Sequence, residues 1–466
     1  MTETYSPPQN MKKFLVIWLG QVISIIGSGL TGFALGVWIY EQTGQATPFA
    51  LTVLFGSLPR ILLSPIAGSL ADRWNRRWIM IIADTGSALV TLSVVFLLGM
   101  GDLQVWHIYL VAALSSVFAA FQEPAYTASI TMLVPKKELA RASGMVQMAQ
   151  ALEMIIAPLL AGILFVSIGM NGIILIDFIT FFFAIGALLL VKIPQPKLKE
   201  DEVKSERGTV IRDMVFGWNY LWTRKGLLGI LIYFALANFL FNFAAVLYIP
   251  MILAFTTAAV LGLVQMVAGS GMLGGSLLMS AWGGPKKRRI NAVIGFITLA
   301  GIGLILTGLQ ASAVFIAAGM FLFMFCIPLA SSPSQAIFQT KVAPDVQGRV
   351  FAIRGMISRS MMPLAFLIAG PLADRVFNPL LEAGGALADT FVGSLIGVDP
   401  GRGIGLIFIL AGSAMLIASL AAYSNPRIRN VEQELPDAIP DQPDQVVTQP
   451  EIDGEPESPG LSTVEM

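Results

Sequence analysis

Seven charged side chains lie inside long apolar stretches of this chain, and they are the residues best placed to do chemistry. They are Arg60, Asp84, Glu123, Glu153 and Asp177 in the first half, and Arg354 and Arg359 in the second half. A charge is expensive at the depth of a lipid bilayer unless it faces a cavity or a partner. A carboxyl group at that depth that loads and releases a proton is what coupling to a proton gradient requires. These positions therefore indicate ion or substrate handling inside a membrane.

Glu123 is the first candidate for a proton-binding group. It lies directly before Pro124, which removes one helical hydrogen bond and leaves a carbonyl without its usual donor. A polar side chain beside a weakened backbone suits ion or substrate handling. The alternative is that Glu123 pairs with an arginine such as Arg60 as a purely structural ion pair.

Three other acids are weaker candidates. Glu153 follows Gln147 and Gln150 at three-residue steps, which puts a narrow polar stripe on one helix, and we expect that stripe to face a central cavity. Asp177 is expected near the outer end of its helix, where a structural role explains it at least as well. Asp84 is expected to brace the charged turn that precedes it. The proton-coupling candidates are Glu123, Glu153, Asp177 and Arg60.

The composition requires a membrane protein to hold these residues. Of 466 residues, 55% are hydrophobic and 12% are charged, whereas a soluble domain carries about 25% charged residues. Cys326 is the only cysteine and His107 the only histidine, which disfavours a disulfide framework, a metal site and a Ser-His-Asp triad. The sequence contains no phosphate-binding loop of an ATP-driven pump. We therefore expect no enzyme, no metal and no cofactor, and no basic surface suggests nucleic acid.

The apolar runs predict an all-α polytopic membrane protein with about twelve transmembrane helices. The predicted helices span residues 14–40, 46–70, 78–99, 106–131, 143–168, 171–191, 226–252, 258–282, 290–310, 312–333, 350–375 and 402–424. Lysines and arginines gather on alternate connections, and only Arg375 and Arg402 fall on the others. By the positive-inside rule, both termini are expected in the cytoplasm, with the chain in the plasma (inner) membrane.

The predicted helices form two related halves. Residues 131–135 (Thr-Met-Leu-Val-Pro) are answered by residues 340–344 (Thr-Lys-Val-Ala-Pro), and Pro124 matches Pro333 at the same spacing. Such a parallel repeat predicts two six-helix bundles that rock around a site at the membrane midplane. The expected divisions are a cytoplasmic N-terminus (1–13), a first bundle (14–192), a linker (193–225), a second bundle (226–424) and a disordered acidic tail (425–466). Within the linker, residues 210–222 are expected to form an amphipathic surface helix.

The charged turn between the second and third helices reads Gly-Ser-Leu-Ala-Asp-Arg-Trp-Asn-Arg-Arg over residues 68–77. It resembles the signature loop of the major facilitator superfamily. Asn75 stands where that family usually has glycine, and asparagine tolerates the left-handed backbone that a tight turn there would need. The alternative is that these charges only fix topology. The resemblance implies a conformational-switch loop made of Gly68, Asp72, Arg73, Arg76, Arg77 and Asp84.

A closer resemblance is to the macrolide-efflux branch of that superfamily. It rests on residues 121–125, 133–135, 141–144 and 347–350. It implies export of amphipathic drugs or secondary metabolites by proton antiport. The glycine-proline motif of such antiporters is present only in part, at Pro158 and Gly162, and their arginine in the fourth helix is absent. A facilitator or symporter for a small metabolite, and a transport-dead sensor that signals through the tail, stay as alternatives.

Polar residues among aromatic and methionine side chains mark the expected substrate cavity. Asn238 and Asn242 lie one helical turn apart among phenylalanines, and such a lining suits bulky, mostly apolar ligands. Ordinary helix packing is the alternative for each residue alone. The cavity candidates are Gln147, Gln150, Asn238, Asn242, Gln265 and Arg359. The expected partners are a small-molecule substrate, protons and the lipid bilayer, with the protein acting as a monomer.

Overall fold

A computed structural model describes residues 11–135, 138–193, 218–342 and 344–435. The surroundings of some residues within its helices also lie outside the described structure, among them Gly68, Asp72, Arg73 and Arg359. All elements of the described part are helices. The long helices are α1 (Met11–Thr43), α2 (Ala46–Arg73), α3 (Arg76–Met100), α4 (Val105–Leu133), α5 (Leu139–Leu190), α7 (Lys225–Leu253), α8 (Ala258–Trp282), α9 (Arg289–Leu309), α10 (Ala313–Lys341), α11 (Pro344–Leu372) and α14 (Arg402–Ser424).

Helix α5 consists of two membrane-crossing limbs. It has 52 residues and would be about 78 Å long if straight, whereas the hydrocarbon core of a bilayer is about 30 Å thick. Gly169 interrupts it with φ +66° and ψ −177°, a backbone conformation that favours glycine. Eleven helices of the described chain are long and apolar enough to cross a membrane, and α5 counts among them once. The prediction of a helical membrane protein with about twelve spans is confirmed.

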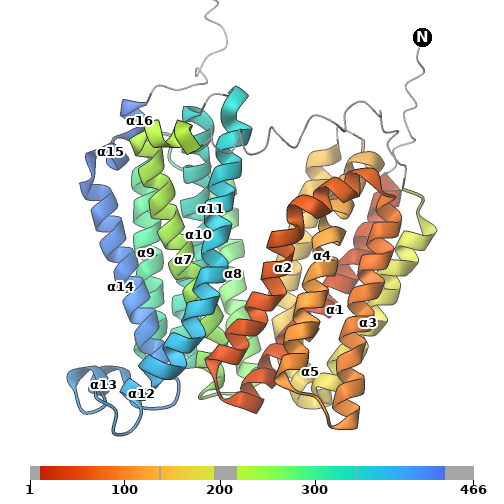
Figure 1. Cartoon of the computed structure of the whole chain (residues 1–466). Helices are drawn as coiled ribbons and strands as arrows, with labels where there is room; N and C mark the ends of the chain where they lie inside the picture. Colours follow the sequence, from red (N-terminus) through yellow and green to blue (C-terminus); the bar gives the residue numbers. More distant parts are fainter. Residues whose placement is uncertain (1–10, 136–137, 194–217, 343, 436–466) are drawn as a thin grey trace, which may run out of the picture.

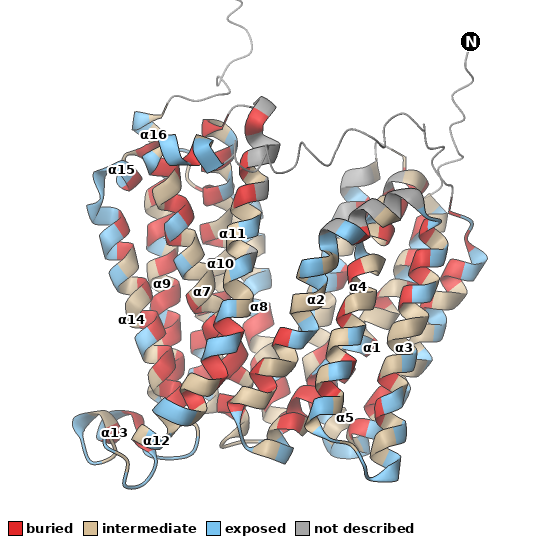
Figure 2. Ribbon diagram, in the orientation of Figure 1, coloured by how far each residue is buried: buried red, intermediate tan, exposed pale blue. Residues whose placement is uncertain are grey.

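The helices form two bundles, α1–α5 and α7–α14 (Figure 1). We call the end at which Met11 begins α1 and Leu435 ends the described chain the terminal face, and the opposite end the distal face. Large apolar side chains such as Phe96 and Ile417 remain exposed on the outer surfaces, where lipid would cover them. Buried residues concentrate inside the bundles, as the red segments of Figure 2 show.

Within the described residues, the apolar core joins the two bundles in their distal part. One core runs through the second bundle and into the distal halves of the first five helices, where it includes Phe33, Phe49 and Ala161. A separate core around Phe14, Met80 and Leu188 fills the terminal end of the first bundle. The ribbons accordingly converge at the distal face and diverge toward the terminal face (Figure 1).

Close helix crossings at the distal side depend on glycine. A Cβ on Gly262 of α8 would lie 2.4 Å from the Pro158 carbonyl oxygen of α5, and one on Gly162 would lie 2.7 Å from that of Ala258. These distances are too short for any side chain, so α5 and α8 touch backbone to backbone. The motif residues Pro158 and Gly162 therefore lie at the interface between the bundles.

The distal connection between α11 and α14 contains three short helices: the π-helix η3 (Ala373–Phe377), α12 (Asn378–Leu381) and α13 (Phe391–Ile396). Two more, α15 (Pro426–Arg429) and α16 (Val431–Glu434), occupy the start of the predicted acidic tail. Lys341 holds them by donating from Nζ to the carbonyl oxygens of Glu432 at 2.6 Å and Leu435 at 2.5 Å. The folded chain thus continues to Leu435, beyond the predicted boundary at residue 425.

The rest of the predicted tail, residues 436–466, lies outside the described residues. Most of the linker does so as well. Of the predicted surface helix at 210–222, only residues 218–222 are described, and they are helical. Trp218 and Trp222 are exposed on it, as expected for a helix at a membrane–water interface.

Candidate functional site

Three helices of the first bundle bring Arg60, Glu123 and Glu153 together. Arg60 Nε donates to Glu123 Oε2 at 3.0 Å, and Nη2 of the same guanidinium also bonds that oxygen. Arg60 attracts Glu153 electrostatically as well. The side chains of Arg60 and Glu123 are 49% and 56% exposed, so the ion pair is not enclosed within the bundle. Arg60 and Glu123 therefore form an accessible ion pair that connects α2 with α4.

Local packing fixes this group. The backbone N–H of Arg60 donates to Ser116 Oγ of α4 at 3.1 Å, which anchors the middle of α2 against the helix that carries Glu123. Helix α4 continues through Pro124 without ending there. A Cβ on Gly29 of α1 would lie 3.2 Å from Glu153 Cγ, so α1 limits the room around that carboxylate. Gln147 and Gln150, the other members of the predicted stripe, are exposed.

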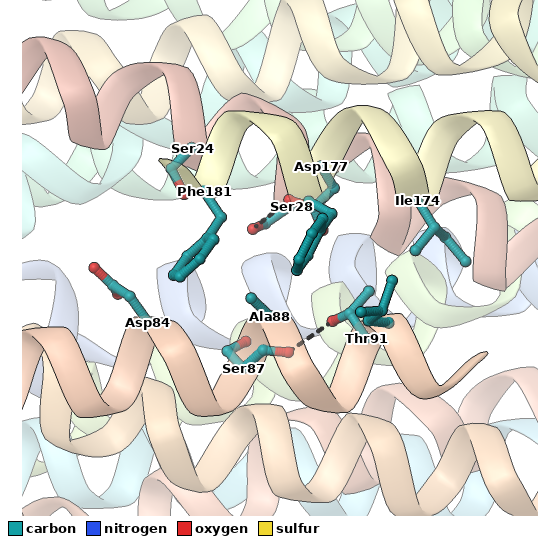
Figure 3. Close-up of a pocket in the computed structure, with 11 residues that line it drawn as sticks. Ser24, Ser28, Asp84, Ser87, Ala88, Thr91, Ile174, Asp177 and Phe181 are labelled. Carbon is teal, nitrogen blue, oxygen red and sulfur yellow. Dashed lines mark hydrogen bonds between the residues drawn. The ribbon is translucent and has the colours of Figure 1, made fainter. Parts of the chain in front are cut away.

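A second polar group lies inside the first bundle, in a cavity of about 60 Å³ between α1, α3 and the second limb of α5 (Figure 3). Asp177 accepts hydrogen bonds from Ser28 Oγ at 3.2 Å and Thr31 Oγ1 at 2.8 Å. It is 8% exposed and therefore lies within the bundle. Asp84 and Ser87 line the same cavity, so two of the four predicted acids face one small polar space.

Gln21 of α1 links this space to the helix that carries Glu123. Its Nε2 donates to Asp84 Oδ2 at 3.1 Å, and its Oε1 accepts from Gln122 Nε2 at 3.0 Å. A continuous hydrogen-bonded path thus runs from α3 through α1 to α4. Sequence reasoning missed Gln21, although a lone amide inside the apolar first helix was a usable signal.

Two arginines of the predicted switch loop bond to other helices of the first bundle, Arg76 within α4 and Arg77 at the C-terminal end of α5. Arg76 Nη1 donates to the Ala128 carbonyl oxygen at 2.9 Å. Arg77 donates to the carbonyl oxygens of Leu188 at 2.6 Å and Leu189 at 2.7 Å, at the end of α5. A cation is favourable at a helix C-terminus because the last carbonyls are unpaired and the helix dipole is negative there. The surroundings of Gly68 and the side chains of Asp72 and Arg73 lie outside the described structure.

The expectation for the backbone of Asn75 was wrong. Its φ is −66°, not left-handed, and it serves as the N-cap of α3. Its Oδ1 accepts from the backbone N–H of Arg77 at 3.1 Å and of Trp78 at 3.4 Å. Asparagine is favoured at this position because a helix start leaves N–H groups unpaired.

In the second bundle, the predicted cavity amides bond to their own helix. Asn238 Nδ2 donates to the Phe234 carbonyl oxygen at 2.9 Å, and Asn242 Nδ2 donates to that of Asn238 at 2.7 Å. Their carboxamide oxygens are left to accept hydrogen bonds from elsewhere. Phe241 stacks on Phe323 with ring centroids 5.4 Å apart. Gln265 is half-buried on α8, and the side chain of Arg359 lies outside the described structure.

Arg354 of α11 is a further candidate that the set of predicted cavity residues left out. Its Nη1 donates to Gln335 Oε1 at 2.6 Å and its Nη2 to Ser334 Oγ at 3.2 Å. The guanidinium lies 4.6 Å from the ring centroid of Phe338 and 5.8 Å from that of Phe234. These partners are neutral or aromatic, so no carboxylate among the described residues forms an ion pair with Arg354.

Comparisons with known proteins agree with this architecture. The family model described as Major Facilitator Superfamily matches residues 17–366. Macrolide efflux protein A of Streptococcus pyogenes is 31% identical over 78% of this chain and 90% of its own length. The multidrug efflux pump Tap of Mycolicibacterium fortuitum is 23% identical over 80% of this chain and 91% of its own length.

Solved structures show the same fold. A bacterial homologue of the human lysosomal transporter Spinster, in an inward-facing and unoccupied conformation, superposes with a TM-score of 0.67 at 15% identity, over 92% of this chain and 98% of that one. A bacterial homologue of the iron transporter ferroportin superposes with a TM-score of 0.61 at 14% identity, over 89% and 99% of the two chains. The resemblance in the charged turn is confirmed, and the chain belongs to the major facilitator superfamily as a multi-pass membrane transporter.

Proposed function

We propose that this transporter is a proton-coupled exporter of amphipathic drugs or secondary metabolites that works by alternating access. The observation that carries the proposal is the ion pair of Arg60 with Glu123, whose side chains are about half exposed although both lie within long apolar helices. The similarity to proteins named for macrolide and multidrug efflux supports the direction and the substrate class.

The orientation follows from the charges. Exposed Lys192, Lys286, Lys287 and Arg288 lie at the terminal face, and lysine and arginine are enriched on the cytoplasmic side of membrane proteins. The terminal face is then cytoplasmic. Because the apolar core of the described residues joins the bundles in their distal part, we take the conformation to be one that opens toward the cytoplasm. We infer that the protein acts as a monomer, because every residue that the mechanism uses lies in one chain.

Protonation of Glu123 would drive the cycle by changing the partner of Arg60. A proton on Glu123 removes the negative charge that holds the guanidinium and frees Arg60 to pair with Glu153. Because Glu123 lies on α4, Arg60 on α2 and Glu153 on α5, the exchange changes the forces between three helices of one bundle. Release of the proton restores the first pair. Asp177 is bonded to hydroxyl groups instead, and we assign it a structural role.

The second bundle would supply most of the substrate contacts. Phenylalanines around Asn238, Asn242 and Phe241 offer an apolar, polarizable surface, and the free amide oxygens and Arg354 offer a few directional contacts. Such a lining binds bulky ligands with scattered polar groups better than it binds sugars, which need denser hydrogen bonding.

The test is proton movement in everted membrane vesicles that hold a pH gradient. Macrolides, hydrophobic cations and anionic metabolites are added one at a time to vesicles with wild-type protein, with Glu123→Gln, or with the control Glu382→Gln. Glu382 is an exposed glutamate of the distal connection, so its substitution makes the same chemical change away from the ion pair. We expect one class of compound to collapse the gradient in wild type and control but not in Glu123→Gln.

Other outcomes would identify the alternatives. If no compound moves protons while radiolabelled substrates still equilibrate across the membrane, the protein is a facilitator and the antiport mechanism is wrong. If no substrate moves at all, deletion of residues 436–466 separates two explanations. A transporter that was tested with the wrong compounds should keep its effect on the cell after this deletion. A sensor that signals through the tail should lose its effect.

A further inference from the structure

At the distal face, one bundle completes a helix of the other. The first N–H groups of a helix have no partner within it, and Gln45, the residue that precedes α2, supplies no side-chain cap. Asp374 of η3 supplies it across the bundle interface. Its Oδ1 accepts from the backbone N–H of Ala46 at 2.9 Å, and its Oδ2 accepts from the backbone N–H of Thr47 at 2.7 Å and from Thr47 Oγ1 at 2.5 Å.

This contact is strong for two physical reasons. Hydrogen bonds to an ionised carboxylate are stronger than neutral ones, and a negative charge is favourable at the N-terminus of a helix. The backbones also meet one turn earlier, because a Cβ on Gly370 would lie only 2.5 Å from Thr47 Cα. Gly370 and Asp374 are four residues apart and so share one face of α11 and η3. Gly370 permits the close backbone contact, and Asp374 supplies the charged hydrogen bonds. We call these two contacts with α2 the joint.

The sequence around the joint is a second copy of a pattern found elsewhere in the chain. Residues 370–375 read Gly-Pro-Leu-Ala-Asp-Arg, and residues 68–73 read Gly-Ser-Leu-Ala-Asp-Arg. The first copy ends α2 at the terminal face, whereas the second ends α11 at the distal face. The second copy also runs into the π-helix η3. Turns of π-helix are rare in proteins, and many of those that occur lie at functional sites. Asp374 therefore lies in a distinct structural element, the π-helix η3.

We propose that Asp374 is a latch that holds the distal face closed by capping α2 from the opposite bundle. The bundles have to release this cap before the distal face opens, so its strength sets the ratio of the two conformations. A group that stabilises only one conformation shifts the ratio by its differential free energy. This inference concerns the conformational equilibrium and holds whatever the substrate or the coupling ion is.

The test measures distances between spin labels on the full chain in lipid nanodiscs. Cys326, the only cysteine, is replaced by alanine to give a background without native thiols. Labels on exposed positions of the two bundles then report each face separately. The distal pair is Asp102 with Ala383, and the terminal pair is Lys192 with Lys287.

Asp374→Ala is expected to raise the ratio of distal-open to distal-closed protein about tenfold, a factor within the range that loss of a helix N-cap produces. The distal distance lengthens while the terminal distance shortens in the same fraction of molecules. Asp389→Ala, which removes an exposed charge from the same distal connection, should leave both distances unchanged. Gly370→Ala keeps the charge but separates the helices, and should shift both distances in the direction of Asp374→Ala.

Unchanged distances in folded Asp374→Ala would overturn the proposal. So would a longer distal distance without a shorter terminal one, because that result means local fraying rather than a change of conformation. If Asp374→Ala does not fold, Thr47→Val and Gly370→Ala decide. Thr47→Val removes only the hydroxyl donor at nearly constant shape and should give a smaller shift of the same sign, and no shift in either variant rejects the latch.

Discussion

The two bundles hold their membrane-embedded arginines in opposite ways. In the first bundle, Arg60 is neutralised by Glu123 and attracted by Glu153. In the second, Arg354 bonds to an amide and a hydroxyl and lies near two aromatic rings. Between Lys225 and Asp345 the sequence contains no aspartate or glutamate at all. One bundle therefore combines cation and acids, and the other has cations and aromatic surface.

This difference separates two tasks that the repeat could have shared. Pro124 matches Pro333 in the second half, so the position of Glu123 corresponds to Ser332. A carboxylate binds protons and a serine hydroxyl does not, and the second half therefore lacks the group that would bind a proton at this position. An arginine without a carboxylate is instead free to attract an acceptor group of a ligand. Under the proposed function, we therefore assign proton handling to the first bundle and substrate contact to the second.

The sharpest way to break this assignment is Arg60→Gln. Without the guanidinium, protonation of Glu123 no longer changes any pairing, so we expect proton-driven accumulation of substrate to disappear. The loss should reach about 100-fold at a pH difference of about two units, the ratio that one coupled proton sustains. Accumulation in everted vesicles measures it, and Arg375→Gln, an exposed distal arginine, is the control. If Arg60→Gln still accumulates substrate, proton coupling does not run through this ion pair.

Arg354→Gln should have a smaller effect of another kind. The variant loses the guanidinium that would contact an acceptor group of the substrate, and a hydrogen bond to a charged group contributes about 1.5 to 3 kcal/mol. We expect the substrate concentration for half-maximal export to rise about tenfold, with the number of protons moved per substrate unchanged. Dose–response curves in the same vesicles separate the two quantities. A changed proton ratio would contradict the division of tasks.

Much of the fold could be predicted because membrane helices follow from local sequence. The interruption of α5 at Gly169 lies between the predicted spans 143–168 and 171–191, since length alone forbids one straight span there. The helices between Pro426 and Glu434 could not be predicted, because they depend on Lys341 reaching carbonyl groups from a distant helix. Composition predicted disorder for that segment, and a tertiary contact overrides it.

The candidate site was predictable only in its residue types. Charge at bilayer depth singled out Arg60 and Glu123, and their ion pair is compatible with both interpretations of Glu123, as a proton-binding group and as a structural partner of Arg60. Asn75 was expected to be left-handed, and it is an N-cap, because the sequence does not say which residue begins α3. The cap of Asp374 on α2 joins residues more than 300 positions apart, and no local pattern reports such a pairing.

Asp177→Asn is the mildest change and tests whether every acid of the first bundle handles protons. Asparagine keeps an oxygen for Thr31 and loses part of the bonding to Ser28, and one hydrogen bond contributes about 0.5 to 1.5 kcal/mol to stability. We therefore expect a lower unfolding temperature, but export per folded molecule within about threefold of wild type. Thermal unfolding in detergent and vesicle assays normalised to protein amount measure both, with Asp102→Asn as the exposed control. If folded Asp177→Asn loses proton movement as completely as Glu123→Gln, the polar cavity belongs to the proton path. Replacement of a purely structural carboxylate would not abolish proton movement in a protein that stays folded.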